Sequence, residues 1–393
     1  MSSITFQGYV RPNGKVGSRN LVAVIPSVIC ATDVAQGICR AVQGTVGFFH
    51  HQGCCQLPVD LKRVTDTLIG LGCSPNVGAA LVVSLGCEGT DTERLVNEIA
   101  ATGKPVEVLR IQELGGMSRA IQVGTDLAQK LAMEISGQQR ETVDISQVVM
   151  AIKCGASDTT SGMASNCVIG YVADKLVDLG ATVVFGETTE FLGGEHILAR
   201  RAVGGEDGPV GRKIYEIVDR MEKRAAAIGE DMRGGQPTPG NIAGGLSSIE
   251  EKNLGAIVKS GHRPIQGVLE YPQMVTTEKG LWIKDAPGRE PEILTGMAAT
   301  GAQFMLFSTG RGAPQGFPSM PVIKVCGNPN TYARMQHDMD LNAGVIIEGR
   351  KSIDEVGEEA FALLLQVLNG RMTKNEAIHY ISTMDIYCIG PVI

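Results

Sequence analysis

Residues 80–89 read ALVVSLGCEG, in which a short apolar run ends in a glycine turn that carries Cys87 and Glu88. A run of this length, rich in β-branched residues and bounded by glycine, predicts a buried strand. Apolar runs at residues 20–28, 45–49 and 106–111 have the same character, and helical patterns at residues 61–71, 90–101 and 117–135 alternate with them. This alternation predicts an α/β fold with a mostly parallel sheet.

A second α/β region follows the polar stretch SGQQRETVD at residues 136–144. Its predicted strands are residues 148–152, 181–185, 304–307 and 321–325, and its last predicted helices are 355–368 and 374–381. We therefore expect two α/β domains, residues 1–140 and 145–393. Ligands of open α/β sheets gather at the carboxyl ends of strands, so we expect the site there, between the domains.

Composition excludes several classes of function. The chain has 393 residues and a formal charge of −7, and no basic stripe interleaved with aromatic residues indicates nucleic-acid binding. No secretion signal or apolar run long enough to span a membrane occurs, and no glycine motif indicates a nucleotide cofactor. The ten cysteines favour free thiols over a disulfide framework, which points to the cytoplasm.

Candidate metal ligands lie in glycine-containing turns just past predicted strands. His50, Cys54, Cys87 and Cys154 share this position, and His and Cys bind metals such as iron, zinc and manganese. Their spacing is too wide for a closed structural zinc site. The alternative for each cysteine is a small buried apolar residue.

Carboxylates follow the strands as well. Glu88, Glu113, Glu187 and Glu190 could hold a divalent metal or take the α-proton of a hydroxy acid. Helix capping or a solvated turn is the alternative for each of them. His196 precedes a predicted helix and is either a site residue or a packed histidine.

Three segments resemble anion-binding turns. Residues 153–158 contain Ser157 and Asp158, and residues 308–312 contain Thr309 and Arg311. Glycine lets backbone N–H groups converge, and an arginine can hold a carboxylate or a sulfonate in a two-pronged grip. The pair Arg19-Asn20 is the third candidate, with a surface salt bridge as the alternative for Arg19.

Taken together and in order, these motifs identify a family. They are Gly8-Tyr9-Val10-Arg11 with residues 14–20, Gly53-Cys54, Gly86-Cys87-Glu88, Gln112-Glu113, Cys154-Gly155 with Ser157-Asp158, residues 187–190, residues 194–196, residues 239–241 with 244–246, and residues 309–312. From about residue 8 to its end, the chain resembles the altronate and galactarate dehydratase family.

The resemblance implies a lyase that performs a metal-dependent β-elimination on a small 2-hydroxy carboxylate. The implied metal is Fe²⁺, with Mn²⁺ as the alternative, and an iron–sulfur cluster on Cys54, Cys87 and Cys154 is a further possibility. We expect metal ligands among His50, Cys54, Cys87, Glu88 and Cys154, and a base among Glu113, Glu187, Glu190 and His196. The anionic substrate is expected to contact Arg19, Asn20, Ser157, Asp158, Thr309 and Arg311.

The chain starts almost directly at the Gly8-Tyr9 motif, whereas the full-length sugar-acid dehydratases carry a small N-terminal domain. We therefore expect the split form of the family, with a separate small subunit and a homo-oligomer of the large one. The run HHQGCC at residues 50–55 favours the branch that converts (2R)-3-sulfolactate to pyruvate and sulfite. The alternatives are a sugar-acid dehydratase that forms a 2-keto-3-deoxy acid, and a non-catalytic sugar-acid binding or scaffold subunit.

Overall fold

A four-stranded parallel sheet forms the centre of the first part of the chain. The computed structural model describes residues 4–275, 278–381 and 384–393. Within the sheet the order is β4 (Thr45–Gly47), β3 (Leu21–Pro26), β5 (Val77–Ser84) and β6 (Val106–Arg110). Every neighbouring pair is parallel, as the alternating pattern predicts. Helices α1 (Thr32–Ala41) and α4 (Met117–Ser136) cover one face, and α2 (Pro58–Cys73) and α3 (Thr92–Ala100) cover the other.

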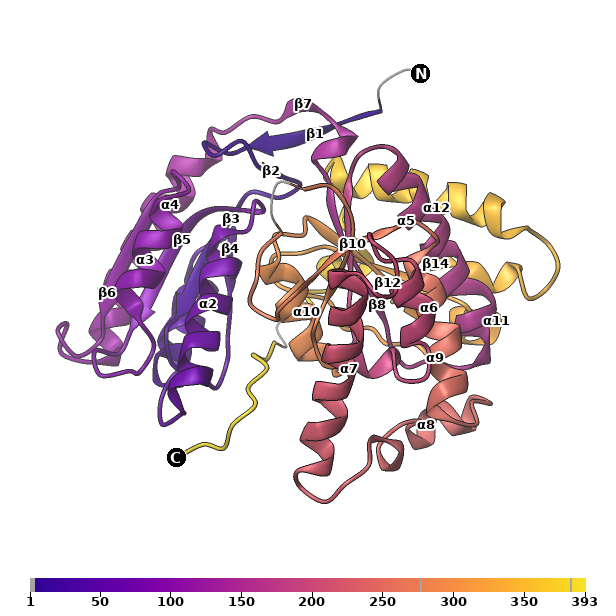
Figure 1. Cartoon of the computed structure of the whole chain (residues 1–393). Coiled ribbons are helices and arrows are strands. Elements are labelled where there is room, and N and C mark those ends of the chain that lie inside the picture. The colour runs from indigo at the N-terminus through magenta and orange to yellow at the C-terminus, as the bar shows by residue number, and fades with distance from the viewer. Residues whose placement is uncertain (1–3, 276–277, 382–383) are drawn as a thin grey trace.

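A seven-stranded parallel sheet forms the centre of the second part (Figure 1). Its order is β10 (Ile265–Leu269), β11 (Gly280–Lys284), β9 (Thr182–Phe185), β8 (Val149–Cys154), β12 (Phe304–Thr309), β13 (Val322–Cys326) and β14 (Leu341–Asn342). One face packs against α5 (Asn166–Asp178), α6 (Glu195–Arg200), α7 (Pro209–Ala226) and α12 (Ile353–Leu368), and the other against α10 (Glu290–Ala299). The fold class is therefore α/β, as predicted.

A small antiparallel sheet lies beside both parallel sheets. It consists of β2 (Val16–Gly17), β1 (Thr5–Val10) and β7 (Glu141–Asp144). The sequence analysis treated residues 136–144 as a polar boundary, but their last four residues form β7 and pair with β1 near the N-terminus. Their side chains are mostly exposed, so no apolar alternation marked them as a strand.

The predicted strands and long helices are confirmed, with ends that differ by a few residues. The exceptions lie at helix ends and in the second sheet. The helix predicted at residues 90–101 begins at Thr92, and Asp91 caps it, because its carboxylate accepts a hydrogen bond from the backbone N–H of Arg94. The last predicted helix ends early, as α13 (Lys374–Ala377), although its Thr373–Glu376 capping box is present. Strands β10 and β11 were not predicted from the sequence.

The two parallel sheets share one apolar core. Helices α2 and α10 pack side by side, and a Cβ at Gly70 would lie 2.5 Å from the carbonyl oxygen of Ala299. Asn76 is fully buried at the same junction, where its side chain donates to the carbonyl oxygens of Gln303 and Ser319, each at 2.8 Å. Because an unpaired buried amide is costly, these contacts tie the two sheets together.

The order of the strands determines where a ligand can bind. In the seven-stranded sheet the chain runs from β8 to β9, on to the edge strand β10 and back to β11 between them, and then crosses to the opposite side of β8 as β12. In the four-stranded sheet the same reversal occurs between β3 and β5. The loops that leave such neighbouring strands diverge and open a crevice at their carboxyl ends, which is where ligands of α/β sheets bind.

Two further features bear on the expectations from sequence. None of the helices in the described part of the chain combines the length and the apolar character that a membrane span requires. All ten cysteines are free thiols.

Candidate active site

A charged cleft of the second sheet lies at the carboxyl ends of β8 and β9. It has a volume of about 580 Å³. The loops after the two strands, the segment around α8 (Pro239–Ala243) and residues 287–290 line it. Its polar side chains include Cys154, Ser157, Glu187, Glu190, Thr238, Asn241, Lys252, Arg289 and Glu290. We call this cleft the catalytic cavity.

Buried charges form the floor of the catalytic cavity. The Glu187 carboxylate accepts from Lys153 Nζ at 2.9 Å and from Lys259 Nζ at 2.6 Å. Lys259 also contacts Glu190, whose other oxygen lies 3.4 Å from Lys252 Nζ. The side chains of Lys153 and Lys259 are 0% exposed, and that of Glu187 is 1% exposed. Each charge is held in place by opposite charges, which is the only way such groups remain ionised inside a protein.

The two buried carboxylates have different proton affinities. Burial and the adjacent Glu190 carboxylate raise the pKa of Glu187 above its usual value, although both lysines oppose the shift. Burial also acts on Glu190, yet the cations of Lys259 and Lys252 lower its pKa to about 2. Two neighbouring carboxylates whose pKa values are pushed apart are typical of acid–base catalysis, and Glu187 is the stronger base of the pair.

The backbone of the catalytic cavity is strained at two points. Glu187 has a φ of 71° and Ala156 has a φ of 48°, both in the left-handed region that favours glycine. The strain at Glu187 turns its side chain back toward β8, where its carboxylate also accepts from the backbone N–H of Cys154 at 2.8 Å. Backbone strain of this kind persists only where surrounding contacts enforce it, and it clusters at functional sites.

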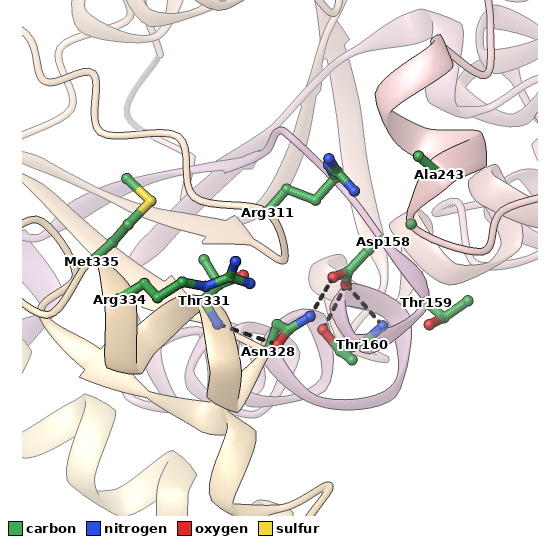
Figure 2. A pocket seen from close by; sticks show the side chains of 10 residues that line it. Asp158, Thr159, Thr160, Ala243, Arg311, Asn328, Thr331, Arg334 and Met335 are labelled. Atoms are coloured by element: carbon green, nitrogen blue, oxygen red, sulfur yellow. Dashed lines mark hydrogen bonds between the residues drawn. The ribbon is translucent and has the colours of Figure 1, made fainter.

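A smaller cavity adjoins the first on the side of β12 and β13. Its volume is about 450 Å³, and it holds Arg311 from the turn after β12 and Arg334 from the end of α11 (Pro329–Arg334). Figure 2 shows Asp158 near Arg311 and Asn328, and its carboxylate accepts hydrogen bonds from Asn328 and Thr160. We call this space the arginine cavity.

The strand ends of the first sheet form a separate polar cluster. Glu88 accepts from the hydroxyls of Ser27 and Ser84, each at 2.6 Å, from Thr92 and from the N–H of Gly86. Despite burial, these bonds lower the pKa of Glu88 to about 2. Cys54 lies close by with its Sγ 3.7 Å from that of Cys55, and both thiols are exposed.

The five predicted metal ligands do not converge in this arrangement. His50 is buried, its Nε2 lies 2.8 Å from the carbonyl oxygen of Pro26, and its Nδ1 accepts from the N–H of Gln52. Glu88 is saturated by its four donors, and Cys154 belongs to the other sheet, 3.0 Å from the Ser157 hydroxyl. Among the residues that the structure describes, no three His, Cys, Asp or Glu side chains are grouped as a metal would require. The predicted set therefore does not fit a single metal centre here.

Several other predicted site residues lie away from both cavities. Arg19 pairs with Glu376 at 2.8 Å and donates to three backbone carbonyls, and the Asn20 side chain binds Arg11 and Ile135. Both precede β3, at the end of the strand opposite to the turns discussed above. Arg19 thus ties neighbouring segments together and lines neither cavity, in contrast to the expected position of a substrate-binding residue.

Some of the remaining predicted residues lie outside the two cavities, and others line them. Glu113 is exposed and 3.7 Å from Arg110, and His196 lies half-buried in α6, outside the lining of either cavity. Thr309 is buried and accepts from the N–H groups of Gly312 and Ala313, so it shapes the turn that carries Arg311. Ser157, Asp158, Cys154, Glu187, Glu190 and Arg311 line the cavities, and their predicted roles stay predictions.

Sequence reasoning missed most of the cations. Lys153 lies in the segment 153–158, but no role was predicted for it. No sequence pattern indicated a role for Lys252, Lys259, Arg289 or Arg334. Their identity as site residues depends on the elements that fold over the strand ends, and lysine is ordinarily a surface residue. A buried glutamate pair after β9 was the one available signal, since two such charges require nearby cations.

Fold and cavity together place buried carboxylates and several cations at the switch point of a parallel sheet, an arrangement typical of α/β enzymes. The family model for the second domain of D-galactarate dehydratase/altronate hydrolase matches residues 8–136, and that for the C-terminal domain of D-galactarate/altronate dehydratase matches residues 145–390. The chain belongs to the D-galactarate/altronate dehydratase family.

Curated relatives agree with this assignment. The chain is 38% identical to the (2R)-sulfolactate sulfo-lyase subunit beta of Chromohalobacter salexigens, over 95% of each chain. It is 31% identical to the altronate dehydratase of Bacillus subtilis and 32% identical to the galactarate dehydratase (L-threo-forming) of Escherichia coli. These matches cover 95% and 94% of this chain but 75% and 74% of those relatives. The chain is thus an enzyme of the lyase class, which sets aside the scaffold alternative.

The buried network predicts a large difference between two lysine variants. Lys259→Met leaves two carboxylates without their shared cation, so we expect it to lower the free energy of unfolding by about 3–5 kcal/mol. Lys130→Met removes an exposed pair with Glu107, and we expect no measurable change. Equilibrium urea unfolding of both variants tests this, and equal midpoints would show that the network contributes nothing to stability.

Proposed function

We propose that this chain is the catalytic subunit of a lyase that eliminates sulfite from (2R)-3-sulfolactate and forms pyruvate. The observation that carries the proposal is the 38% identity to a sulfolactate sulfo-lyase subunit, against 31% and 32% to two sugar-acid dehydratases. The cations around the cavities support it, because this substrate carries two anionic groups.

The reaction needs a base, a cationic side chain that binds the substrate carboxylate, and a site that accepts the leaving group. The base takes the proton from C2, the C–H electron pair forms the C2–C3 double bond, and the C3–S bond breaks with its electrons going to sulfite. The enol that remains tautomerises to pyruvate. Dehydration of a sugar acid, the second candidate, follows the same steps with water as the leaving group.

Glu187 is the proposed base. It lines the catalytic cavity, and burial raises the pKa of its carboxyl. Lys153 and Lys259 fix its two oxygens, so the carboxylate needs little reorganisation when it accepts a proton. Glu190, whose pKa is about 2, serves to hold Lys259 and Lys252 in place.

Arg289 and Lys252 are the proposed partners of the substrate carboxylate. Both line the catalytic cavity, and Arg289 is 65% exposed at the rim. Asp385, in the C-terminal segment, lies 3.1 Å from Arg289 and 3.4 Å from His51 of the first sheet. This bridge orients the guanidinium and links the strand ends of the two sheets. The Ser157 hydroxyl and the neutral Cys154 thiol, whose pKa burial raises, complete the polar wall.

We also propose a cytoplasmic location and a separate small subunit. Ten free thiols suit a reducing compartment. The sulfo-lyase relative is named as a subunit beta, which supports a partner chain for this protein as well.

Release of products from 3-sulfolactate tests the substrate. We expect the purified chain, co-expressed with its small subunit and supplied with iron, to form sulfite and pyruvate in equal amounts. Sulfite is measured with a thiol-reactive dye and pyruvate with lactate dehydrogenase. A protein that releases no sulfite but dehydrates altronate or galactarate would instead be the second candidate.

Glu187→Gln tests the base. Loss of a general base costs about 10²–10⁴-fold in rate, so we expect a fall of at least 100-fold in kcat. The change keeps the size of the side chain and its acceptor for the N–H of Cys154. Glu216→Gln, on the exposed side of α7, is the matched control and should keep full activity. A Glu187 variant with more than a tenth of the activity would exclude this residue as the base.

Metal removal tests the predicted iron requirement. We predict that chelation lowers kcat/KM and that Fe²⁺ restores it, while metal analysis finds iron bound to the active protein. Since the predicted ligands are not grouped, iron-loaded protein should show which thiols are protected from alkylation. Full activity of metal-free protein would refute the requirement and leave the roles of Glu187 and Arg289 unchanged.

A further inference from the structure

The arginine cavity contains two guanidinium groups without a carboxylate partner. Neither Arg311 nor Arg334 forms an ion pair with any carboxylate in the part of the chain that the structure describes. Asp158 is the single acidic residue in the lining, and Asn328, Thr160 and the N–H of Ser161 already occupy its oxygens. One carboxylate against two guanidiniums leaves the cavity with a net positive charge.

Hydroxyl groups complete the lining. Those of Thr159 and Thr331 have no hydrogen-bond partner among the described residues, and Thr331 is only 6% exposed. The two hydroxyls and the two guanidiniums lie in the lining of one cavity, as Figure 2 shows for their side chains. Such a set of donors suits a ligand with several acceptor oxygens, since each guanidinium can donate two parallel bonds to an oxyanion.

The frame of the arginine cavity is rigid. A Cβ at Gly310 would lie 2.0 Å from Asp158 Oδ1, so the turn after β12 packs directly against this carboxylate. The N–H of Arg311 donates to the carbonyl oxygen of Ala156 at 2.8 Å. Gly312 has a φ of 92°, and a Cβ there would meet Met335 Sδ at 2.3 Å. These close approaches fix the turn of Arg311 against the end of α11, which carries Arg334.

The arginine cavity shares walls with the catalytic cavity. The loop after β8 supplies Ser157 to the catalytic cavity and Asp158 to the arginine cavity. On the opposite wall, a Cβ at Gly240 would lie 3.8 Å from Arg311 Nε and 3.7 Å from Thr238 Oγ1, which lines the catalytic cavity. Arg311 therefore stands at the boundary between the two spaces.

We propose that Arg311 and Arg334 form a binding site for a sulfur oxyanion, either the sulfonate of the bound substrate or the sulfite that leaves. The site rests on the proposed function and adds to it the residue that would select the leaving group. Arg334 would favour a substrate with a second, strongly anionic end over a neutral polyol. The net positive charge of the cavity suits the −2 charge of free sulfite.

Direct binding of sulfite and of its unreactive analogue sulfate tests the site. The assay is isothermal titration calorimetry of the complete enzyme at low ionic strength. We expect Arg334→Gln and Arg311→Gln to weaken binding at least 10-fold, whereas Arg350→Gln, an exposed arginine paired with Glu348, leaves it unchanged. Arg334→Lys should weaken it too, because a lysine keeps the charge but lacks the two-pronged grip. Unchanged anion binding in folded Arg334→Gln and Arg311→Gln would overturn the proposal.

Kinetics separates the two sources of the anion. A KM for 3-sulfolactate that rises at least 10-fold in Arg334→Gln, with weaker inhibition by sulfite, supports a site that holds the sulfonate before and after cleavage. Weaker inhibition with an unchanged KM supports a site for the released sulfite alone. If the wild-type enzyme cleaves no sulfolactate but still binds sulfate through Arg334, the proposed reaction fails while the anion site stands.

Discussion

The ion network of Lys153, Glu187, Lys259 and Glu190 is the constraint on which the rest of the site depends. Four charges with almost no exposure stay ionised only if each has opposite charges at contact distance. Lys153 belongs to β8, the glutamates follow β9, and Lys259 lies in the 3-10 turn at residues 258–260. The network therefore joins three separate segments beneath the catalytic cavity. It also holds the strained backbone of Glu187 in a conformation that few non-glycine residues adopt.

The switch points of the two parallel sheets carry different kinds of side chains. The one in the second sheet combines buried carboxylates, lysines and arginines, which suits proton transfer and anion binding. The one in the first sheet gathers exposed thiols, a saturated Glu88 and a buried His50, whose pKa burial lowers to about 4. Asp385 connects them by contacting His51 on one side and Arg289 on the other.

Much of the fold followed from local pattern. Buried strands such as β5, all eight residues of which are buried, form uninterrupted apolar runs that sequence shows directly. Strand β7 could not be predicted in this way, because three of its four side chains are exposed. Its pairing with β1 also joins residues more than a hundred positions apart. Among the residues that line the two cavities, local pattern indicated those in strand-end turns, such as Ser157 and Arg311. It did not indicate Lys259 and Arg334, which lie in helical segments whose position over the sheet no local pattern reveals.

The sequence by itself determined the parallel sheets, the turns at their carboxyl ends and the family, because apolar periodicity and ordered motifs are local properties of the chain. Only the tertiary structure decided which of those turns share a cavity. Arg19, Glu113 and His196 carry the right chemistry yet lie outside both cavities, and the predicted metal ligands fall into two groups on different sheets. Strand order and the packing of α8 and α11 over the strand ends set these distances, and both arise from contacts between residues far apart in the chain.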